Sequence, residues 1–357
     1  MNKGTYKINQ FIQVDKNLYF VPANMNIFVE YSTENNEESK ILDLPECSFK
    51  GINPYLGIAR CGDRIVVIPN HADKFLVYNI GRNEMLEISI PMDGIDCNPW
   101  GYFSEGFEYD NKLFVVGNVY PGIVKLNLEK QECLITVNIS DGTRGKNGCC
   151  FSSPVCIGDT IYTLIIGENR ILSFSMKTET VDYIEIGQTQ IEQALSLSSS
   201  DNSLWILFDD GSLRTLDTTT LKETYYMTEM GPYLKDNEYK YMAITGNSLY
   251  VGADNEAPIL KLSLDDPVKV DTIWKEGVSG LGYSIYGFSF SCSFDLLFLD
   301  KKGFKNYAID SKSGSIAEFS LFSDTNRIIS MGLISNDNVF QERDMSLSEF
   351  LTYLVND

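Results

Sequence analysis

Short apolar segments recur along the chain at a nearly constant interval. Each is six residues long, begins at a polar residue, and is followed by a polar turn and another apolar segment. The seven segments are NLYFVP from Asn17, RIVVIP from Arg64, KLFVVG from Lys112, TIYTLI from Thr160, SLWILF from Ser203, SLYVGA from Ser248 and DLLFLD from Asp295. Successive segments are 43 to 48 residues apart. A fixed period of about 40 to 50 residues built from short strands is typical of a β-propeller, in which each repeat forms one four-stranded sheet, or blade.

The third repeat shows the strands expected inside one blade. Its four apolar segments are FSEGFEY (103–109), KLFVVGN (112–118), GIVKLNLE (122–129) and QECLITVN (131–138). They are rich in Val, Ile, Leu and Phe, and Gly, Asn, Asp or Lys separates them, which is the pattern of strands joined by tight hairpins. The same four positions recur in the other repeats.

The first segment of most repeats is rich in small residues. Gly57, Ala59, Ser104, Gly106, Ser152, Ser153, Ala194, Ala243, Gly287 and Ser289 fall there, whereas the first repeat has Gln10, Phe11 and Ile12. Innermost strands of a propeller converge on its axis, where neighbouring backbones leave little room for side chains. We therefore expect these segments to line the centre of the ring.

The sequence predicts an all-β, seven-bladed β-propeller over residues 1–335. The runs DNKLFVVGN (110–118) and GNSLYVGAD (246–254) resemble kelch-type propeller repeats, with one glycine where that family has two. The resemblance implies the propeller fold and assigns no functional residue. The way in which the ring closes is left open, and RIISMGLIS (327–335) is a candidate strand for this closure.

A C-terminal tail, residues 336–357, is expected to hold one short amphipathic helix. Ser346 and Glu349 form a capping-box pattern, and the apolar residues Leu347, Phe350, Leu351 and Leu354 follow the helical period. Such a short helix needs a surface to pack on. It either docks on the propeller itself or binds a partner.

Charge and cysteine content restrict the partners and the compartment. Among the 357 residues, 49 are Asp or Glu and 29 are Lys or Arg, for a net charge of −20. This charge disfavours nucleic acid and anionic membranes as partners, and it favours solubility or, alternatively, a basic partner. The eight cysteines form no CxxC pair, and no signal peptide or membrane-spanning segment is found. We therefore expect reduced thiols and a cytoplasmic protein.

Motifs for catalysis are missing from the sequence. His71 is the single histidine, which leaves none for a histidine metal site or a separate Ser-His-Asp triad, and we expect it in a solvated turn. The glycine-rich stretch 277–287 has no lysine for a phosphate loop. We therefore expect no metal, no cofactor and a non-catalytic protein. The oligomeric state is left open.

Long loops between repeats carry aromatic and polar residues that one face of a propeller would bring together. The candidate ligand-binding residues are Tyr55, Trp100, Tyr102, Tyr120, Arg144, Arg170, Tyr233, Tyr239, Tyr283 and Tyr286. Their types suit a protein or peptide partner, because Tyr, Trp and Arg dominate binding hot spots. The alternative is a glycan-binding or carbohydrate-modifying propeller, with Glu168, Asp209 and Asp254 as acids or bases. A third interpretation is that the aromatic residues only fill gaps between blades.

Overall fold

The computed structural model is an all-β ring. It describes residues 3–5, 8–22, 26–32, 34–35, 37–45, 54–92, 102–139, 150–186, 193–235, 239–253, 258–273, 289–291, 294–300, 305–309, 316–319 and 322–324. Within these ranges the chain forms thirty strands and one short helix, α1 (Gly231–Leu234). Twenty-eight of the strands make seven four-stranded antiparallel sheets, and each sheet is built from four consecutive strands.

The blades follow the chain in order. Blade 1 contains β2 (Ile8–Val14), β3 (Asn17–Pro22), β4 (Ile27–Ser32) and β5 (Glu37–Asp43). Blade 2 contains β6 (Tyr55–Cys61), β7 (Arg64–Pro69), β8 (Lys74–Asn79) and β9 (Glu84–Ser89). Blade 3 contains β10 (Phe103–Tyr109), β11 (Lys112–Gly117), β12 (Gly122–Asn127) and β13 (Glu132–Asn138). Blade 4 contains β14 (Phe151–Ile157), β15 (Thr160–Ile165), β16 (Arg170–Ser175) and β17 (Thr180–Glu185).

The remaining blades repeat this plan. Blade 5 contains β18 (Ala194–Ser200), β19 (Ser203–Phe208), β20 (Ser212–Asp217) and β21 (Glu223–Met227). Blade 6 contains β22 (Tyr239–Thr245), β23 (Ser248–Ala253), β24 (Ile259–Ser263) and β25 (Asp271–Ile273). Blade 7 contains β26 (Ser289–Ser291), β27 (Phe294–Asp300), β28 (Lys305–Ile309) and β29 (Ile316–Phe319). The predicted seven-bladed propeller is thus confirmed.

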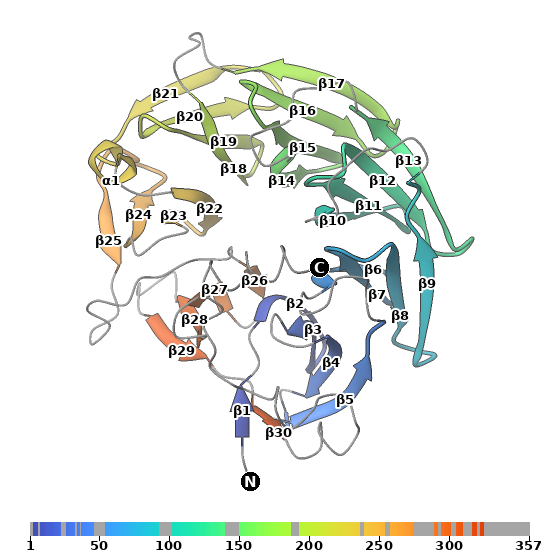
Figure 1. The fold of residues 1–357 in the computed structure, drawn as a ribbon. Coiled ribbons are helices and arrows are strands. Elements are labelled where there is room, and N and C mark those ends of the chain that lie inside the picture. The colour runs from blue at the N-terminus through green and yellow to red at the C-terminus, as the bar shows by residue number, and fades with distance from the viewer. Residues whose placement is uncertain are drawn as a thin grey trace, which may run out of the picture.

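The first strand of each blade lies innermost, around the centre of the ring (Figure 1). Strand β2 contacts β6 and β26, and contacts continue from β6 to β10, β14, β18 and β22. The outermost strands, such as β9, β13, β17 and β21, form the outer edge of the disc (Figure 1). A side chain on an innermost strand can therefore face its counterparts from several blades.

The second strand of each blade is the most deeply buried, which explains the sequence pattern. Six of the seven apolar segments coincide with β3, β7, β11, β15, β19 and β23, and β27 begins one residue earlier, at Phe294. In the six strands with described side chains, only the first residue is half-buried and the other five are buried. Both faces of such a strand are covered by neighbouring blades, so the strand is apolar throughout instead of alternating.

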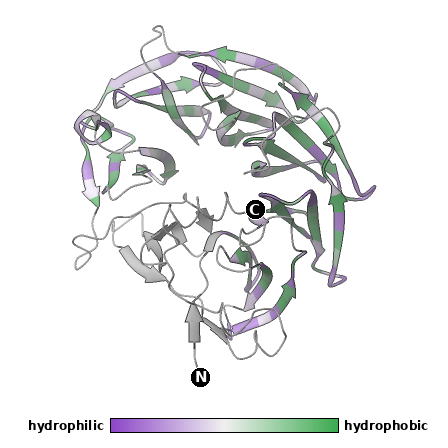
Figure 2. Cartoon of the chain, in the orientation of Figure 1, coloured by the Kyte–Doolittle hydropathy of each residue, from purple (hydrophilic) through white to green (hydrophobic). Residues whose placement is uncertain are grey.

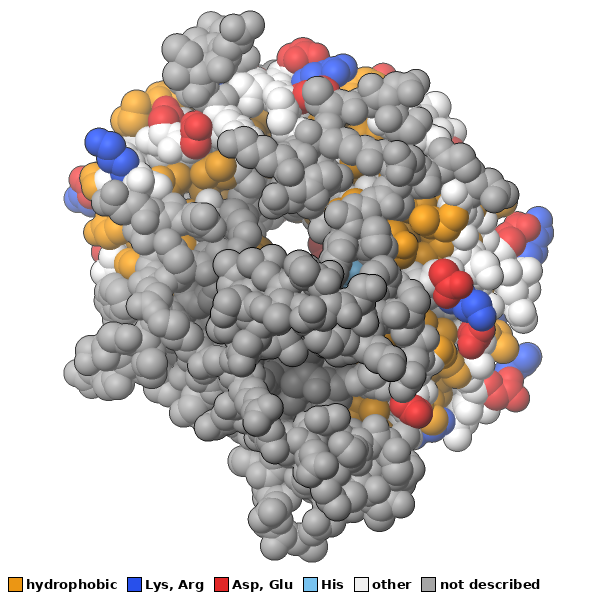
Figure 3. Space-filling view, in the orientation of Figure 1, with side chains coloured by type: hydrophobic (Ala, Val, Ile, Leu, Met, Phe, Trp, Pro, Cys, Tyr) orange, Lys and Arg blue, Asp and Glu red, His pale blue; other side chains and the backbone are white. Residues whose placement is uncertain are grey.

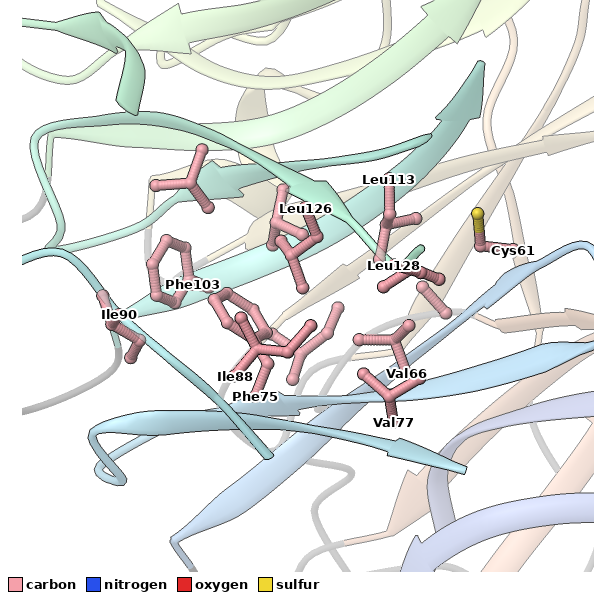
Figure 4. Packing of buried hydrophobic residues seen from close by; sticks show 14 of the residues in the cluster. Cys61, Val66, Phe75, Val77, Ile88, Ile90, Phe103, Leu113, Leu126 and Leu128 are labelled. Atoms are coloured by element: carbon pink, nitrogen blue, oxygen red, sulfur yellow. The ribbon is translucent and has the colours of Figure 1, made fainter. Parts of the chain in front are cut away.

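The hydrophobic core lies between blades. One cluster joins blades 2 and 3 and includes Phe75 of β8, Phe103 of β10 and Tyr120 (Figure 4). The rings of Phe75 and Phe103 are 5.1 Å apart, and those of Phe103 and Tyr120 are 4.9 Å apart. Burying a large apolar side chain contributes roughly 1.5–3 kcal/mol. Figure 2 shows the corresponding band of hydrophobic residues along the strands of the blades.

The two ends of the described chain meet in a separate ribbon. Strand β1 (Lys3–Thr5) pairs antiparallel with β30 (Phe322–Asp324), and Gly4 lies opposite Ser323. Because β1 precedes blade 1 and β30 follows blade 7, this ribbon ties the last blade to the first. The candidate closing strand 327–335 and the predicted C-terminal helix lie outside the described residues.

The structure adds one element that the sequence pattern did not predict. Helix α1 lies in the connection between blades 5 and 6, and Pro232 stands at the start of the helix, a position that proline favours. Within the described part of the chain, no helix is long and apolar enough to cross a membrane.

Candidate functional site

A cavity of about 1000 Å³ occupies the centre of the ring. Its walls come from the innermost strands β2, β6, β10, β14, β18 and β22, as the small residues of these segments predicted. Figure 3 shows an opening at this point of the disc. The lining includes the polar residues Gln10, Arg60, Asn70, Ser104, Glu105, Asn118, Ser152, Ser153, Gln193, Ser196, Ser198, Ser199 and Tyr241. Hydroxyl and amide groups therefore dominate its polar surface.

Steric crowding explains the small residues at two positions. A Cβ atom on Gly57 would stand 3.0 Å from the Cβ of Ile68 in the next strand. A Cβ on Gly106 would stand 3.1 Å from the Cβ of Ala59 in the neighbouring blade. A larger side chain at Gly57 would press on the paired strand β7 of the same blade, whereas one at Gly106 would force β10 away from β6 of the neighbouring blade.

Six of the innermost strands contain an irregularity near their start. In β10, Phe103 pairs with Gly117 but Glu105 pairs with Val116, so Ser104 is an extra residue. Strands β2, β6, β14, β18 and β22 likewise carry an extra residue near their start. Bulges of this kind bend the strand and redirect side chains. As a result, the successive residues Ser104 and Glu105 both line the cavity.

Backbone hydrogen bonds join three blades at one end of the cavity. Asn70 donates to the carbonyl oxygen of Pro54 at 2.8 Å, and Tyr102 donates to that of Asn70 at 3.0 Å. Asn118 then donates to the carbonyl of Tyr102 at 2.8 Å, and Cys150 donates to that of Asn118 at 2.6 Å. This series of bonds fixes the backbone of the loop residues Asn70, Tyr102 and Asn118. We call these three residues the rim.

Three of the predicted ligand-binding tyrosines are part of the core. Tyr55, Tyr120 and Tyr239 have exposed fractions of 1%, 0% and 2%. Tyr55 and Tyr239 open their innermost strands, at the position that Phe103 and Phe151 fill in blades 3 and 4. Burial raises the pKa of the Tyr239 hydroxyl. Their place between blades matches the packing interpretation of the aromatic residues.

Three other predicted residues keep part of their surface. Tyr102 is half-buried and packs against the core of blades 2 and 3, with its ring 6.4 Å from that of Phe103. Tyr233 is half-buried on α1, in the connection between blades 5 and 6. Arg170 forms ion pairs with Glu168 at 2.8 Å and Glu185 at 2.9 Å.

Backbone hydrogen bonds therefore tie Tyr102 to Asn70 and Asn118, which line the cavity, while its ring packs against the core of blades 2 and 3. Tyr233 lies between β21 and β22, away from these residues in the chain order of the blades. The ion pairs with Glu168 and Glu185 largely neutralise the charge of Arg170, which weakens its attraction for an anionic ligand. The remaining predicted residues, Trp100, Arg144, Tyr283 and Tyr286, lie outside the described residues.

The carboxylates proposed as acids or bases have structural partners where they are described. Glu168 accepts a hydrogen bond from Arg170 at 2.8 Å, and Asp209 accepts one from the backbone of Gln193 at 3.0 Å. Asp254 lies outside the described residues. The carboxylate that does line the cavity is Glu105, and burial raises its pKa from 4.5 to about 7. The sequence signal for it was an acidic residue in a segment otherwise rich in small residues.

The single histidine and the described cysteines offer little chemistry. His71 is buried, so the expectation of a solvated turn residue was wrong; its backbone N–H bonds to the carbonyl of Pro54 at 3.0 Å, which draws the turn inward. Cys61, Cys133, Cys150 and Cys156 are free thiols. Among the described residues, no group of three or more His, Cys, Asp or Glu side chains could hold a metal ion.

Comparisons with known proteins support the fold. No protein-family model matches the chain, and no curated protein matches its sequence. Among solved structures, virginiamycin B lyase from Staphylococcus aureus has a TM-score of 0.57 at 12% identity, covering 83% of this chain and 94% of the lyase. BamB from Moraxella catarrhalis has a TM-score of 0.54 at 11% identity, covering 88% of this chain and 85% of BamB. Hsv2 from Kluyveromyces lactis has a TM-score of 0.54 at 7% identity, covering 88% of this chain and 98% of Hsv2. At these identities the likeness extends to the fold alone, and that fold is the β-propeller.

Proposed function

We propose that this protein is a kelch-like, non-catalytic binding module that recognises a protein or peptide segment through the loop face of its propeller. The observation that carries the proposal is the rim, where the backbone of the half-buried Tyr102 is hydrogen-bonded to Asn70 and Asn118 at the end of the central cavity. Loops held on a rigid scaffold are where binding residues concentrate. A tyrosine flanked by amides offers an apolar surface together with hydrogen-bonding groups.

Two further parts of the proposal concern domain organisation and compartment. The propeller is taken to span residues 1–335, with 336–357 as a separate helical tail that docks on the ring or on the partner. A cytoplasmic setting agrees with the free thiols of Cys61, Cys133, Cys150 and Cys156, because such thiols persist in a reducing compartment.

The test compares two tyrosine variants. Tagged wild type, Tyr102→Ala and Tyr183→Ala are used to capture proteins from the lysate of the native cell, with quantification by mass spectrometry. Tyr183 is the matched control, because it is exposed on the outer strand β17. We expect the wild type and Tyr183→Ala to enrich one partner at least tenfold over Tyr102→Ala. Titration calorimetry with the purified partner should likewise give a higher affinity for the wild type and Tyr183→Ala than for Tyr102→Ala.

Thermal unfolding of each variant shows whether it is folded. Equal enrichment by all three proteins would exclude Tyr102 as a contact. If Tyr102→Ala loses the fold instead, Tyr102 belongs to the core and the assignment of the rim is wrong.

A glycan ligand is the second candidate, and the hydroxyl- and amide-lined cavity with Glu105 favours it. Sugar hydroxyls can bond to such groups, and a carboxyl with a raised pKa is a common general acid. Hydrolysis of a glycosidic bond ordinarily needs two carboxyl groups. Glu105 is the one carboxylate in the described lining, which favours glycan binding over cleavage. A glycan array probed with the wild type and with Glu105→Gln tests this candidate: a saccharide retained only by the wild type supports it.

A further inference from the structure

Glu105 stands at a distinctive place in the molecule. It is the third residue of β10, just after the bulge, and its side chain lines the central cavity. Strands rise about 3.3 Å per residue, so Glu105 lies roughly 10 Å along the strand from Tyr102 of the rim. It is therefore inside the ring, within reach of a long side chain that enters past the rim.

The carboxylate of Glu105 has no hydrogen-bond or ion-pair partner among the described residues. Two other described carboxylates, those of Glu30 and Glu108, do have one. Glu30 accepts hydrogen bonds from Asn17 at 2.8 Å and Tyr78 at 3.3 Å, and Glu108, on the same strand as Glu105, accepts one from the backbone of Gly62 at 3.0 Å. A carboxylate in a protein-walled cavity without a partner is costly unless it takes up a proton or a cation.

The cationic groups of the strands that pack against β10 form no ion pair with Glu105 among the described residues. On β6, Arg60 also lines the cavity, but its Nε donates to the carbonyl of Gly62 at 3.0 Å. On β7 and β11, Arg64 and Lys112 lie near Asp63 at 3.9 Å and Asp110 at 3.5 Å.

The titratable group that β14 contributes to the cavity is Cys156. Burial raises the pKa of its thiol to about 11, which keeps it neutral. Burial is also the cause of the raised pKa of Glu105, which is about 7. The cavity therefore offers an acidic group near neutral pH that forms no ion pair among the described residues, although Arg60 is also part of the lining.

We propose that the central cavity receives a lysine or arginine side chain of the partner peptide and that Glu105 is the group that pairs with it. This inference rests on the proposed function and specifies its ligand. The flexible stem of lysine or the longer guanidinium of arginine can pass the rim while the peptide backbone stays outside. Hydroxyl oxygens of Ser104 and Ser196, which also line the cavity, can accept the remaining N–H bonds.

The net charge of the whole chain agrees with a basic partner. At −20, the protein attracts a positively charged segment over a distance and speeds its encounter. The half-buried Glu105, which has no partner among the described residues, then supplies the specific contact, because a carboxylate inside the ring gains more from a cation than one in open solvent does. Long-range attraction and the local contact thus favour the same class of ligand.

The test uses fluorescein-labelled degenerate heptapeptide pools that differ only at the central residue. That residue is Lys, Arg, norleucine or Glu, and norleucine keeps the aliphatic stem of lysine without its charge. Fluorescence polarisation measures binding to the wild type, to Glu105→Gln, and to Glu129→Gln as the control. Glu129 is exposed, so the control makes the same change in net charge away from the cavity.

We expect the Lys or Arg pool to bind wild type and Glu129→Gln at least tenfold more tightly than the norleucine pool. Glu105→Gln should lose this preference. Since the cation binds the ionised carboxylate, affinity for the wild type should rise about tenfold from pH 6 to pH 8, where lysine and arginine remain charged. Glu105→Gln should show no such dependence.

The outcomes separate this inference from the proposed function. If the pools bind in a way that Tyr102→Ala abolishes, but without a basic preference or without loss in Glu105→Gln, the peptide-binding role stands and the pairing with Glu105 is wrong. If no pool binds the wild type, both proposals are overturned. Thermal unfolding of each variant shows whether it is folded as well as the wild type. Because glutamine has the same size as glutamate, we expect Glu105→Gln to keep the fold.

Discussion

The hydroxyl of Tyr239 donates a hydrogen bond to the backbone carbonyl oxygen of Pro258 at 2.6 Å. Tyr239 opens the innermost strand of blade 6, and Pro258 directly precedes β24 of the same blade. The tyrosine thereby fixes the start of β22 to the residue before β24 from inside the core. Tyr120, between β11 and β12, makes a similar bond across two blades, to the carbonyl of Pro91 after β9 at 2.9 Å.

Replacing Tyr239 by phenylalanine should weaken the fold slightly and leave binding intact. The ring stays packed while the hydrogen bond is lost, which lowers the free energy of unfolding by about 0.5–1.5 kcal/mol. Urea denaturation followed by tryptophan fluorescence measures the change. Tyr120→Phe is the matched comparison and should behave alike. A loss of partner capture with unchanged stability would show instead that Tyr239 contacts the ligand.

The strands could be predicted from the sequence because the second strand of each blade is buried on both faces. Six apolar segments therefore coincide with strands residue for residue. The loop aromatics could not be assigned in the same way. Tyr102 and Tyr120 both lie beside glycine or proline, yet one is half-buried and the other fully buried. Which of them points inward depends on packing between two blades, and no local pattern records that.

The cavity carboxylate was missed for a related reason. Regular alternation along β10 would not place both Ser104 and Glu105 toward the cavity, and the bulge at this point changes the alternation. A bulge depends on how two strands pair, so the spacing of apolar residues gives little sign of it. His71 was misjudged similarly, because its burial comes from a backbone bond to Pro54 in another connection.

Gly117→Ala should destabilise the protein strongly. A Cβ at this position would overlap the carbonyl oxygen of Tyr120 and stand 2.8 Å from that of Gly122. Backbone atoms cannot rotate away, so the connection between β11 and β12 must shift, at a cost of about 1–3 kcal/mol. Gly81→Ala is the control: its nearest neighbour is Asn79 Oδ1 at 3.7 Å, and its effect should stay within about 0.5 kcal/mol. Urea midpoints of the two variants decide the matter, and equal midpoints would contradict the prediction.

Three described thiols, that of the buried Cys61 and those of the half-buried Cys133 and Cys156, should be unreactive in the folded protein. Burial raises the pKa of Cys61 and Cys133 to about 12 and that of Cys156 to about 11. Since the thiolate is the reactive form, iodoacetamide at pH 7.5 should leave these three residues unmodified. Peptide mapping by mass spectrometry measures the labelling, with the protein in urea as the fully reactive reference. Rapid labelling of any of the three under native conditions would be inconsistent with the burial described.

Removing β1 should loosen the end of the ring. Deletion of residues 1–5 takes away the partner of β30, whereas deletion of residues 1–2 leaves Lys3–Thr5 in place and serves as the control. Hydrogen exchange by mass spectrometry should show faster exchange in Phe322–Asp324 and a smaller increase in blade 7. The strands of blades 3 and 4 should keep their protection, because each blade is built from its own four strands. Unchanged exchange in β30 would mean that this ribbon does not hold the ring closed.

Stability should fall between pH 5 and pH 8 because of Glu105. Its folded pKa of about 7 is above the ordinary value of 4.5, so the folded state binds more protons than the unfolded state in this range. The contribution is complete below pH 4.5 and is lost as the pH rises through 7. At about 1.4 kcal/mol for each unit of pKa difference, the upper bound is roughly 3 kcal/mol, reduced by water in the cavity. Urea denaturation at pH 5 and pH 8 measures it. Because other groups also titrate, the quantity compared is the free energy of unfolding of Glu105→Gln minus that of the wild type, which should increase from pH 5 to pH 8. Parallel curves for the two proteins would mean that Glu105 is already ionised in the fold at pH 5.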